Sequence, residues 1–255
     1  MKNVRAGSFV RPDGNGGFCV DWRHLSAESI LATSRLLAEI CARRQFASGR
    51  LLDVGCGSRP YDIVFEGLVE RHVGVDYPSR MHTAGQPDMY AGALALPFRS
   101  ESFDFVLCTE VIEHVPDPFV AMGELARVLK HGGRAIVTTP FMYRVHGAPY
   151  DFFRYTPFAY REMASRAGLI LEELAPRGGY FTVGFDYLMK GLAMVVGGVN
   201  TIVRKIFGTK RHLIESRWVR FLFFMIQRPL IALLRRESVK SETYTLGYVA
   251  ILRKA

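Results

Sequence analysis

The chain has 255 residues and a formal net charge of +9, and this length suits one α/β domain with an extension. Its four cysteines show neither disulfide nor metal-site spacing, so we expect reduced thiols and no metal centre. The segment 1–17 is polar and glycine-rich without an apolar run of signal-peptide length, which argues against a secretory leader.

The first predicted elements are a flexible arm over residues 1–25 and a helix over Ser26–Phe46. Apolar residues of this helix, such as Ile30, Leu37 and Ile40, recur at helical spacing. Ser26 is the expected N-cap, because serine side chains accept hydrogen bonds from the first turn of a helix.

A buried strand that opens into a glycine turn is predicted at Leu51–Gly57. The apolar run ends in Asp53, and Gly55 and Gly57 follow with Cys56 between them. Glycine permits positive φ and lets a ligand approach the backbone. Since Pro60 suits the first position of a following helix, the segment predicts a site for a nucleotide-like ligand.

Two phosphate-binding alternatives are disfavoured at this turn. A dinucleotide site has a third glycine where this chain has Pro60. A P-loop needs Gly-Lys followed by Ser or Thr, and the turn lacks that pattern.

The elements that follow lead to a second acidic strand end. Arg71–Asp76 places a carboxylate about twenty residues after the glycine turn, the spacing expected for a group that accepts from ribose hydroxyls. The adjacent Tyr77 is expected beside adenine. A Leu-Pro-Phe turn is predicted at Leu94–Phe98 and a strand at Glu101–Cys108. A helix that is ended by glycines follows at Pro118–Lys130, and a fifth strand at Arg134–Pro140.

In order and spacing, the segment from Leu51 to Leu171 resembles the class I S-adenosylmethionine (SAM) dependent methyltransferases. The composition agrees with a cytoplasmic enzyme. The resemblance implies SAM as cofactor and a Rossmann-like, mostly parallel seven-stranded sheet whose last strand is antiparallel. It also implies SAM contacts from Asp53, Gly55, Cys56, Gly57, Asp76, Tyr77, Ala93, Leu94, Thr109 and His114.

One position departs from the pattern of the resembled family. Gly92 stands where relatives usually have an acid that accepts from the adenine amino group. We therefore expect adenine recognition to depend on backbone groups near Ala93 and Leu94.

The loop after the fifth strand, Phe141–Thr156, resembles a loop in a methyltransferase subgroup associated with glycan and surface-polymer modification. His146 is the preferred catalytic base, because its unperturbed pKa is near neutral. Asp151 either orients His146 or is the base itself, and Arg154 either holds an acidic acceptor or pairs with Asp151. The alternative is that these are ordinary structural groups, a loop histidine and a local ion pair. The other candidate bases are Tyr143 and Tyr155.

After a helix at Thr156–Ala167 and a sixth strand at Leu169–Leu174, a long insertion over 176–241 precedes the closing strand Glu242–Leu252. The predicted organisation is therefore a core over 26–175, the insertion, and a return to the core over 242–255. So long a connection is expected to have a structure of its own.

The insertion is apolar and basic, and acids are few in it. On a helix, Arg217, Arg220, Gln227, Arg228 and Arg235 would cluster toward one face, opposite aromatic and aliphatic residues, as in helices that lie on anionic membranes. No uncharged run reaches roughly eighteen residues, so we do not expect a spanning helix. Pro229 is expected to kink or break the second apolar segment.

These patterns predict methyl transfer from SAM to an oxygen of a lipid-linked or glycan acceptor, with residues 189–236 in peripheral contact with the inner face of the cell membrane. One alternative is a soluble small-molecule O- or N-methyltransferase whose insertion is a lid or a homodimer arm. Another is a non-catalytic, membrane-tethered partner protein. Nucleic acid is not an expected partner despite the positive charge, because the basic segment is densely apolar and Thr138–Phe141 lacks the Asn/Asp-Pro-Pro of base-methylating enzymes.

Overall fold

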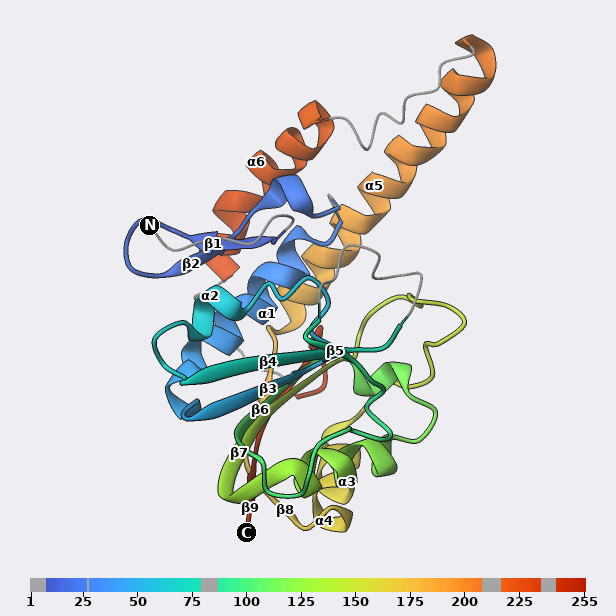
Figure 1. Ribbon diagram of the computed structural model, residues 1–255. Coiled ribbons are helices and arrows are strands. Elements are labelled where there is room, and N and C mark those ends of the chain that lie inside the picture. Colours follow the sequence, from blue (N-terminus) through green and yellow to red (C-terminus); the bar gives the residue numbers. More distant parts are fainter. Residues whose placement is uncertain (1–7, 27, 79–86, 208–216, 235–241) are drawn as a thin grey trace.

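The computed structural model describes residues 8–26, 28–78, 87–207, 217–234 and 242–255 (Figure 1). A seven-stranded sheet forms its centre, with strand order β5-β4-β3-β6-β7-β9-β8. Its strands are β3 (Arg50–Val54), β4 (Arg71–Asp76), β5 (Met89–Tyr90), β6 (Phe103–Thr109), β7 (Leu129–Pro140), β8 (Leu169–Pro176) and β9 (Gly247–Lys254).

Strands β5, β4, β3, β6 and β7 pair in parallel, whereas β9 pairs antiparallel to both β7 and β8. The predicted fold class, a mostly parallel seven-stranded sheet with an antiparallel last strand, is therefore confirmed. The parallel strands are apolar and mostly buried because helices cover both faces of the sheet.

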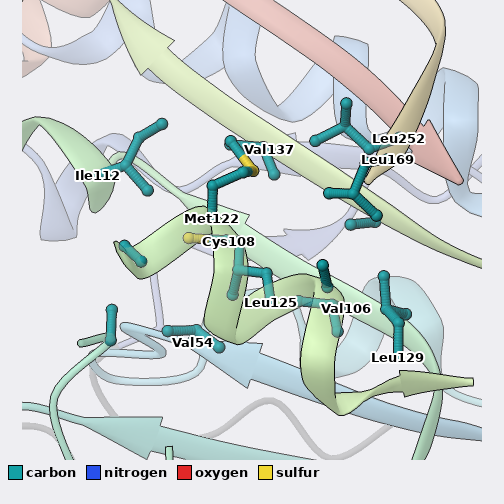
Figure 2. Close-up of a cluster of buried hydrophobic side chains, with 14 of the residues drawn as sticks. Val54, Val106, Cys108, Ile112, Met122, Leu125, Leu129, Val137, Leu169 and Leu252 are labelled. Carbon is teal, nitrogen blue, oxygen red and sulfur yellow. The ribbon is translucent and has the colours of Figure 1, made fainter. Parts of the chain in front are cut away.

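One face of the sheet is covered by α3 (Pro118–Val128) and α4 (Pro157–Arg166). Figure 2 shows this cluster, in which Met122 and Leu125 of α3 pack with Val106 and Val137 of the sheet. Asp117 caps α3 by accepting from the backbone N–H groups of Phe119 and Val120. The helix ends at Val128, two residues before the predicted end, because β7 begins at Leu129.

The opposite face is covered by α1 (Ile30–Arg43) and the one-turn α2 (Asp62–Phe65). The first helix begins four residues after the predicted Ser26, with Ser29 as N-cap, and the short helix η2 (Arg44–Phe46) follows it. The Ser26 hydroxyl instead lies 2.6 Å from that of Ser29. The helix that was predicted to begin at Pro60 is the single turn α2.

Residues 8–25 do not form the predicted loose arm. Strands β1 (Val10–Pro12) and β2 (Phe18–Val20) pair as an antiparallel hairpin, and η1 (Trp22–His24) follows, capped by Asp21. The burial of apolar side chains explains why this segment is structured, since Val10 is fully buried in the core cluster that includes α1.

The insertion consists of α5 (Tyr180–Phe207) and α6 (Arg217–Leu234), which lie on the same side of the sheet as α1 (Figure 1). Met189 and Ala193 of α5 pack against Phe223 of α6. Helix α6 continues through Pro229, so the break expected at this proline does not occur.

One expectation about the insertion differs from the structure, and a second, that it holds no spanning helix, stays a prediction. Gln227 lies on the buried face of α6 and not on an exposed basic face, whereas Arg228 is exposed; the side chains of Arg217, Arg220 and Arg235 lie outside the described residues. Tyr180–Val199 is long and apolar enough to cross a membrane by length and composition. Its mean hydropathy is 1.2 even though it contains the charged Asp186 and Lys190. A single helix of this kind is weak evidence for a span.

Candidate functional site

The glycine turn after β3 uses its two glycines differently. Gly55 has φ of 72°, and a Cβ on it would meet the Cγ2 atom of Val111 at 2.3 Å, so only glycine fits. The backbone N–H groups of Gly55 and Cys56 donate to the Val75 carbonyl at 2.8 and 3.0 Å. Gly57 has φ of 51°, but a Cβ added to it would have no atom of the described residues within 4 Å, which leaves open space for a ligand.

A cavity of about 380 Å³ lies in front of this turn, at the carboxyl ends of β3 and β6. Such a place is where open α/β sheets bind ligands. Five of the predicted site residues line the cavity: Gly55, Cys56, Gly57, Thr109 and His146. Other wall residues come from the start of α1, the N-terminal Phe9, and Tyr143.

The two predicted strand-end carboxylates are buried and are not among the described lining residues of this cavity. Asp53 is 1% exposed and lies 3.3 Å from the Nε2 atom of His72. Burial raises the pKa of Asp53, and the nearby His72 opposes that rise. Asp76 accepts from the backbone N–H of Tyr77 at 2.8 Å, which fixes its carboxylate at the end of β4.

The predicted adenine-binding residues lie beyond β4, next to the segment 79–86, which is outside the described residues. Tyr77 is 61% exposed, whereas Ala93 is buried and Leu94 packs against the core. A Cβ at Gly92 would approach the Tyr77 ring at 3.4 Å, an ordinary contact distance, so an acid would fit there.

The structure brings the predicted catalytic residues His146, Asp151 and Arg154 together in one loop. Asp151 accepts from the guanidinium of Arg154 at 2.6 and 2.8 Å and from the backbone N–H of His146 at 2.7 Å. The hydrogen bonds from Arg154 hold the pKa of Asp151 well below its usual range. Arg154 also donates to the carbonyl of Arg144 at 2.9 Å. Asp151 and Arg154 therefore stabilise the loop as a local ion pair.

His146 is the member of this group that reaches the cavity wall. Burial, assisted by the neighbouring His114, lowers the pKa of His146, so its imidazole is neutral at neutral pH. The ring of His114 lies 4.7 Å away, centroid to centroid. Tyr155, another candidate base, donates its buried hydroxyl to the carbonyl of Ile112 at 2.8 Å and so has a structural role.

Sequence reasoning missed an ion pair at the back of the cavity. Glu110 follows β6 with φ of 55°, a strained value for a residue other than glycine. Its carboxylate accepts from the Thr138 hydroxyl at 2.9 Å and from Arg177 at 3.0 Å. Arg177 is buried and also donates to the carbonyl of Thr139 at 2.9 Å. The only sequence signal was the acid directly after the strand end at Thr109.

The insertion contacts the loop that contains His146. The Nζ atom of Lys190 lies 3.7 Å from the centre of the Tyr143 ring, and Lys190 also pairs with the fully buried Asp186. Helix α5 therefore forms part of the surroundings of the cavity.

The central region of the chain matches a known protein family. Residues 52–137 match the family model described as a methyltransferase domain, Methyltransf_11. An uncharacterized methyltransferase of Mycobacterium marinum is 35% identical over 117 residues, which are 42% of this chain and 46% of that protein. One from Mycobacterium tuberculosis is 38% identical over 96 residues, 34% of this chain and 38% of that protein. The chain thus spans less than half the length of these relatives.

Solved structures share the fold over most of the chain. A geranyl diphosphate C-methyltransferase from Streptomyces coelicolor has a TM-score of 0.56 at 12% identity, over 89% of this chain and 78% of that one. The [4+2]-cyclase SpnF has a TM-score of 0.55 at 16% identity, over 97% and 86%. Identities this low show the fold alone, and a fold does not by itself determine the reaction.

Proposed function

We propose that this chain, in which residues 52–137 are a class I SAM-dependent methyltransferase domain, transfers a methyl group from SAM to an oxygen of a lipid-linked or glycan acceptor. The observation that supports this most is the cavity itself. It joins the open glycine turn at Gly57 to the neutral His146 within one space of about 380 Å³.

The residues present fit SAM as the methyl donor. The turn Gly55–Gly57 leaves room for a ligand against the backbone, and Asp76 lies at the end of β4, the position suited to ribose hydroxyls. When bound, SAM supplies an electrophilic methyl carbon on a sulfonium. The chain's own contribution is to align the acceptor in the cavity and to remove the proton of its hydroxyl, for which His146 is placed.

The acceptor class is inferred from the surface of the insertion. Exposed apolar side chains gather on α6, among them Trp218 at 78% exposure and Leu222 at 58%, and on α5, among them Met194 at 76%. A large exposed apolar surface marks a membrane or protein contact. With the basic residues of 204–240, it suits an anionic membrane at the inner face of the cell membrane.

Calorimetric titration with SAM tests the cofactor part. We expect saturable binding by the intact chain and a strong loss of affinity in Asp76→Ala. Transfer is then measured with methyl-labelled SAM and a bacterial polar-lipid extract, in which label should enter lipid-extractable material. SAM binding without transfer to lipid or glycan would contradict the acceptor class and leave the cofactor assignment intact.

Flotation with phosphatidylglycerol-containing vesicles tests the membrane part. Deleting the insertion is a poor test, because Ile231 and Leu234 of α6 belong to the main core. The double variant Trp218→Glu/Leu222→Glu changes only exposed side chains and should lose flotation. Its matched control is Phe158→Glu/Ile170→Glu, which alters exposed apolar residues on α4 and β8 and should float like the unaltered chain.

A lid over the site is the second candidate role for the insertion, and the contact of Lys190 with Tyr143 favours it. In that case the chain acts on a soluble small molecule, and Trp218→Glu/Leu222→Glu leaves lipid binding unchanged because there is none. A stable dimer in solution, lost in the same variant, would instead identify the apolar surface as a dimer arm.

A further inference from the structure

Three potential metal ligands converge beside the cavity. Glu113 and His114 lie on the 3-10 helix η4 (Ile112–His114), and His146 comes from the loop after β7. Each offers one donor atom, and these atoms all lie within 4.8 Å of one another.

The carboxylate of Glu113 is the unusual member of this group. Its side chain is 0% exposed, and among the described residues neither of its oxygens has a hydrogen-bond partner. A buried carboxylate without partners is costly, because burial removes its hydration and nothing replaces it. Both oxygens are therefore available to a ligand.

The hydrogen bonds of His114 leave its second ring nitrogen free. Its Nδ1 atom faces the Tyr150 carbonyl, which can only accept, so Nδ1 holds the proton. Its Nε2 atom then has a lone pair, and it lies 3.7 Å from Oε1 of Glu113. Metal-binding histidines commonly donate their other N–H to a backbone carbonyl or a carboxylate in this way.

His146 has the same arrangement. Its Nδ1 atom lies 3.3 Å from the carbonyl of Arg144 and 3.4 Å from Oδ2 of Asp151, two acceptors that favour a proton on Nδ1. The guanidinium of Arg154 is also 3.4 Å from this atom, and Arg154 is itself paired with Asp151. Nε2 of His146 is thus left for another ligand.

The charges around the cluster leave Glu113 without a counter-ion. Glu110 pairs with Arg177, and Asp151 pairs with Arg154, so these four charges balance in two pairs. The described ion-pair contact of Glu113 is with His114 at 3.7 Å, and when His114 is neutral it leaves the charge of an ionised Glu113 uncompensated. A cation would compensate it.

We propose that Glu113, His114 and His146 bind a borderline divalent cation, best matched by Zn²⁺. Two imidazoles and one carboxylate with an open fourth position are a known type of zinc site, whereas Mg²⁺ prefers oxygen ligands. Zinc–ligand distances of about 2.0–2.2 Å need donors about 3.4 Å apart, so a spacing of up to 4.8 Å must contract by as much as about 1.4 Å.

This site deepens the proposed function and rests on it. His146 also lines the cavity, whereas Glu113 and His114 are not among its described lining residues, so the cluster lies at the cavity wall. A cation there lowers the pKa of a hydroxyl bound to it. His146 would then hold the cation and not take the proton itself, since one lone pair cannot do both, and the proton of the hydroxyl would pass to solvent water.

Calorimetry with Zn²⁺ alone tests the site in the untagged, metal-depleted full chain. We expect one site per chain with micromolar or tighter affinity, weakened at least about tenfold in Glu113→Gln and in His146→Gln. His131→Gln is the matched control, because the side chain of His131 lies on the surface and is 72% exposed. This variant should bind Zn²⁺ with the same affinity as the unaltered chain.

A spectroscopic measurement guards against variants that fold poorly. Co²⁺ should give an intense visible absorption typical of four or five ligands in the intact chain, and His146→Gln should reduce it while the far-ultraviolet circular dichroism stays the same. Absence of a Zn²⁺ isotherm in the intact chain, or equal affinity in His146→Gln and His131→Gln, overturns the proposal. SAM titration of the same samples separates the two proposals, because SAM binding that persists without a Zn²⁺ isotherm overturns the metal site and leaves the cofactor assignment intact.

Discussion

At the scale of single residues, the site depends on where the fold leaves room and where it does not. Val111 closes the space at Gly55, whereas the space at Gly57 is open. The same residue type thus serves backbone crowding at one position and ligand access two positions later.

Gly92→Asp should strengthen SAM binding. Among the described residues, a Cβ at this position meets only the Tyr77 ring, at 3.4 and 3.8 Å, so the new carboxylate has room to accept from the adenine amino group. A hydrogen bond to a charged group contributes about 1.5 kcal/mol, which corresponds to roughly tenfold in Kd. Titration calorimetry checks this against Gly123→Asp, which adds the same charge on α3. Equal affinities in the two variants would refute an adenine role for position 92.

Glu124→Gln should destabilise the chain at neutral pH and not at acidic pH. Glu124 accepts from the backbone N–H of Leu96 at 2.7 Å and from Arg127 at 2.6 Å, and these bonds hold the turn before β6. The hydrogen bond from Arg127 lowers the pKa of Glu124 in the fold.

Since the folded pKa lies below the unfolded one, the stabilisation by Glu124 is complete above pH of about 4.3 and disappears as the pH falls through the folded value. We expect Glu124→Gln to lower the free energy of unfolding by about 1–2 kcal/mol at pH 7 and by less toward pH 3, as measured by urea unfolding. Glu162→Gln breaks only an exposed pair with Arg166 and should cost under about 0.5 kcal/mol.

Local sequence was sufficient for some of these residues and insufficient for others. Gly55 and Gly57 lie two positions apart and Asp151 and Arg154 three, so spacing in the chain indicated both pairs. Arg177 meets Glu110 from 67 positions away, and only the completed sheet brings them together. For the same reason Glu113 and His114 gave no sign that His146 would join them.

At the scale of elements, the insertion is tied to the site through one buried ion pair. Asp186 is fully buried on α5, and its partner Lys190 also lies over the Tyr143 ring. Burial raises the pKa of Asp186 and lowers the pKa of Lys190, as expected for charges held away from water.

Lys190→Met should destabilise the chain by about 3 kcal/mol, because it leaves Asp186 buried without its counter-ion. The double variant Asp186→Asn/Lys190→Met removes both charges and should recover most of that loss. Urea unfolding of the four members of this cycle measures the coupling. Additive losses, with no recovery in the double variant, would show that the two side chains act independently.

Helical periodicity explains both the success and the error in the insertion. It predicted a helix where α6 occurs, from the offsets of the basic residues between Arg217 and Arg235. It could not tell which side of α6 faces the protein, because that depends on Trp22 and α1, far away in sequence. Gln227 was therefore assigned to the wrong face.

At the scale of the whole molecule, the sheet, the N-terminal hairpin and α6 share one core. Val10, Ile40, Ile251 and Ile231 belong to the same buried cluster. Arg35 of α1 also donates to the carbonyl of Leu234 at the end of α6, at 3.0 Å. We therefore expect these parts to unfold together.

Thermal unfolding should show one transition that SAM raises. SAM at one hundred times its Kd adds about 2.7 kcal/mol to the free energy of unfolding, which raises Tm by roughly 5–10 °C for a chain of this size. Asp76→Ala should unfold in one step as well, without the shift. A second transition in the ligand-free chain, insensitive to SAM, would show that α5 and α6 form a separate unit.

The place of β9 in the sheet has a consequence for synthesis on the ribosome. It lies between β7 and β8 and pairs with both, and Arg253 meets Arg134 across the ladder. Residues 247–254 follow α5 and α6 in the chain, so they leave the exit tunnel after both helices, and until then β7 and β8 have no strand between them. Apolar helices therefore emerge before the sheet that would anchor them is complete, and a membrane or chaperone that engages them at that moment would protect an unfinished chain from aggregation.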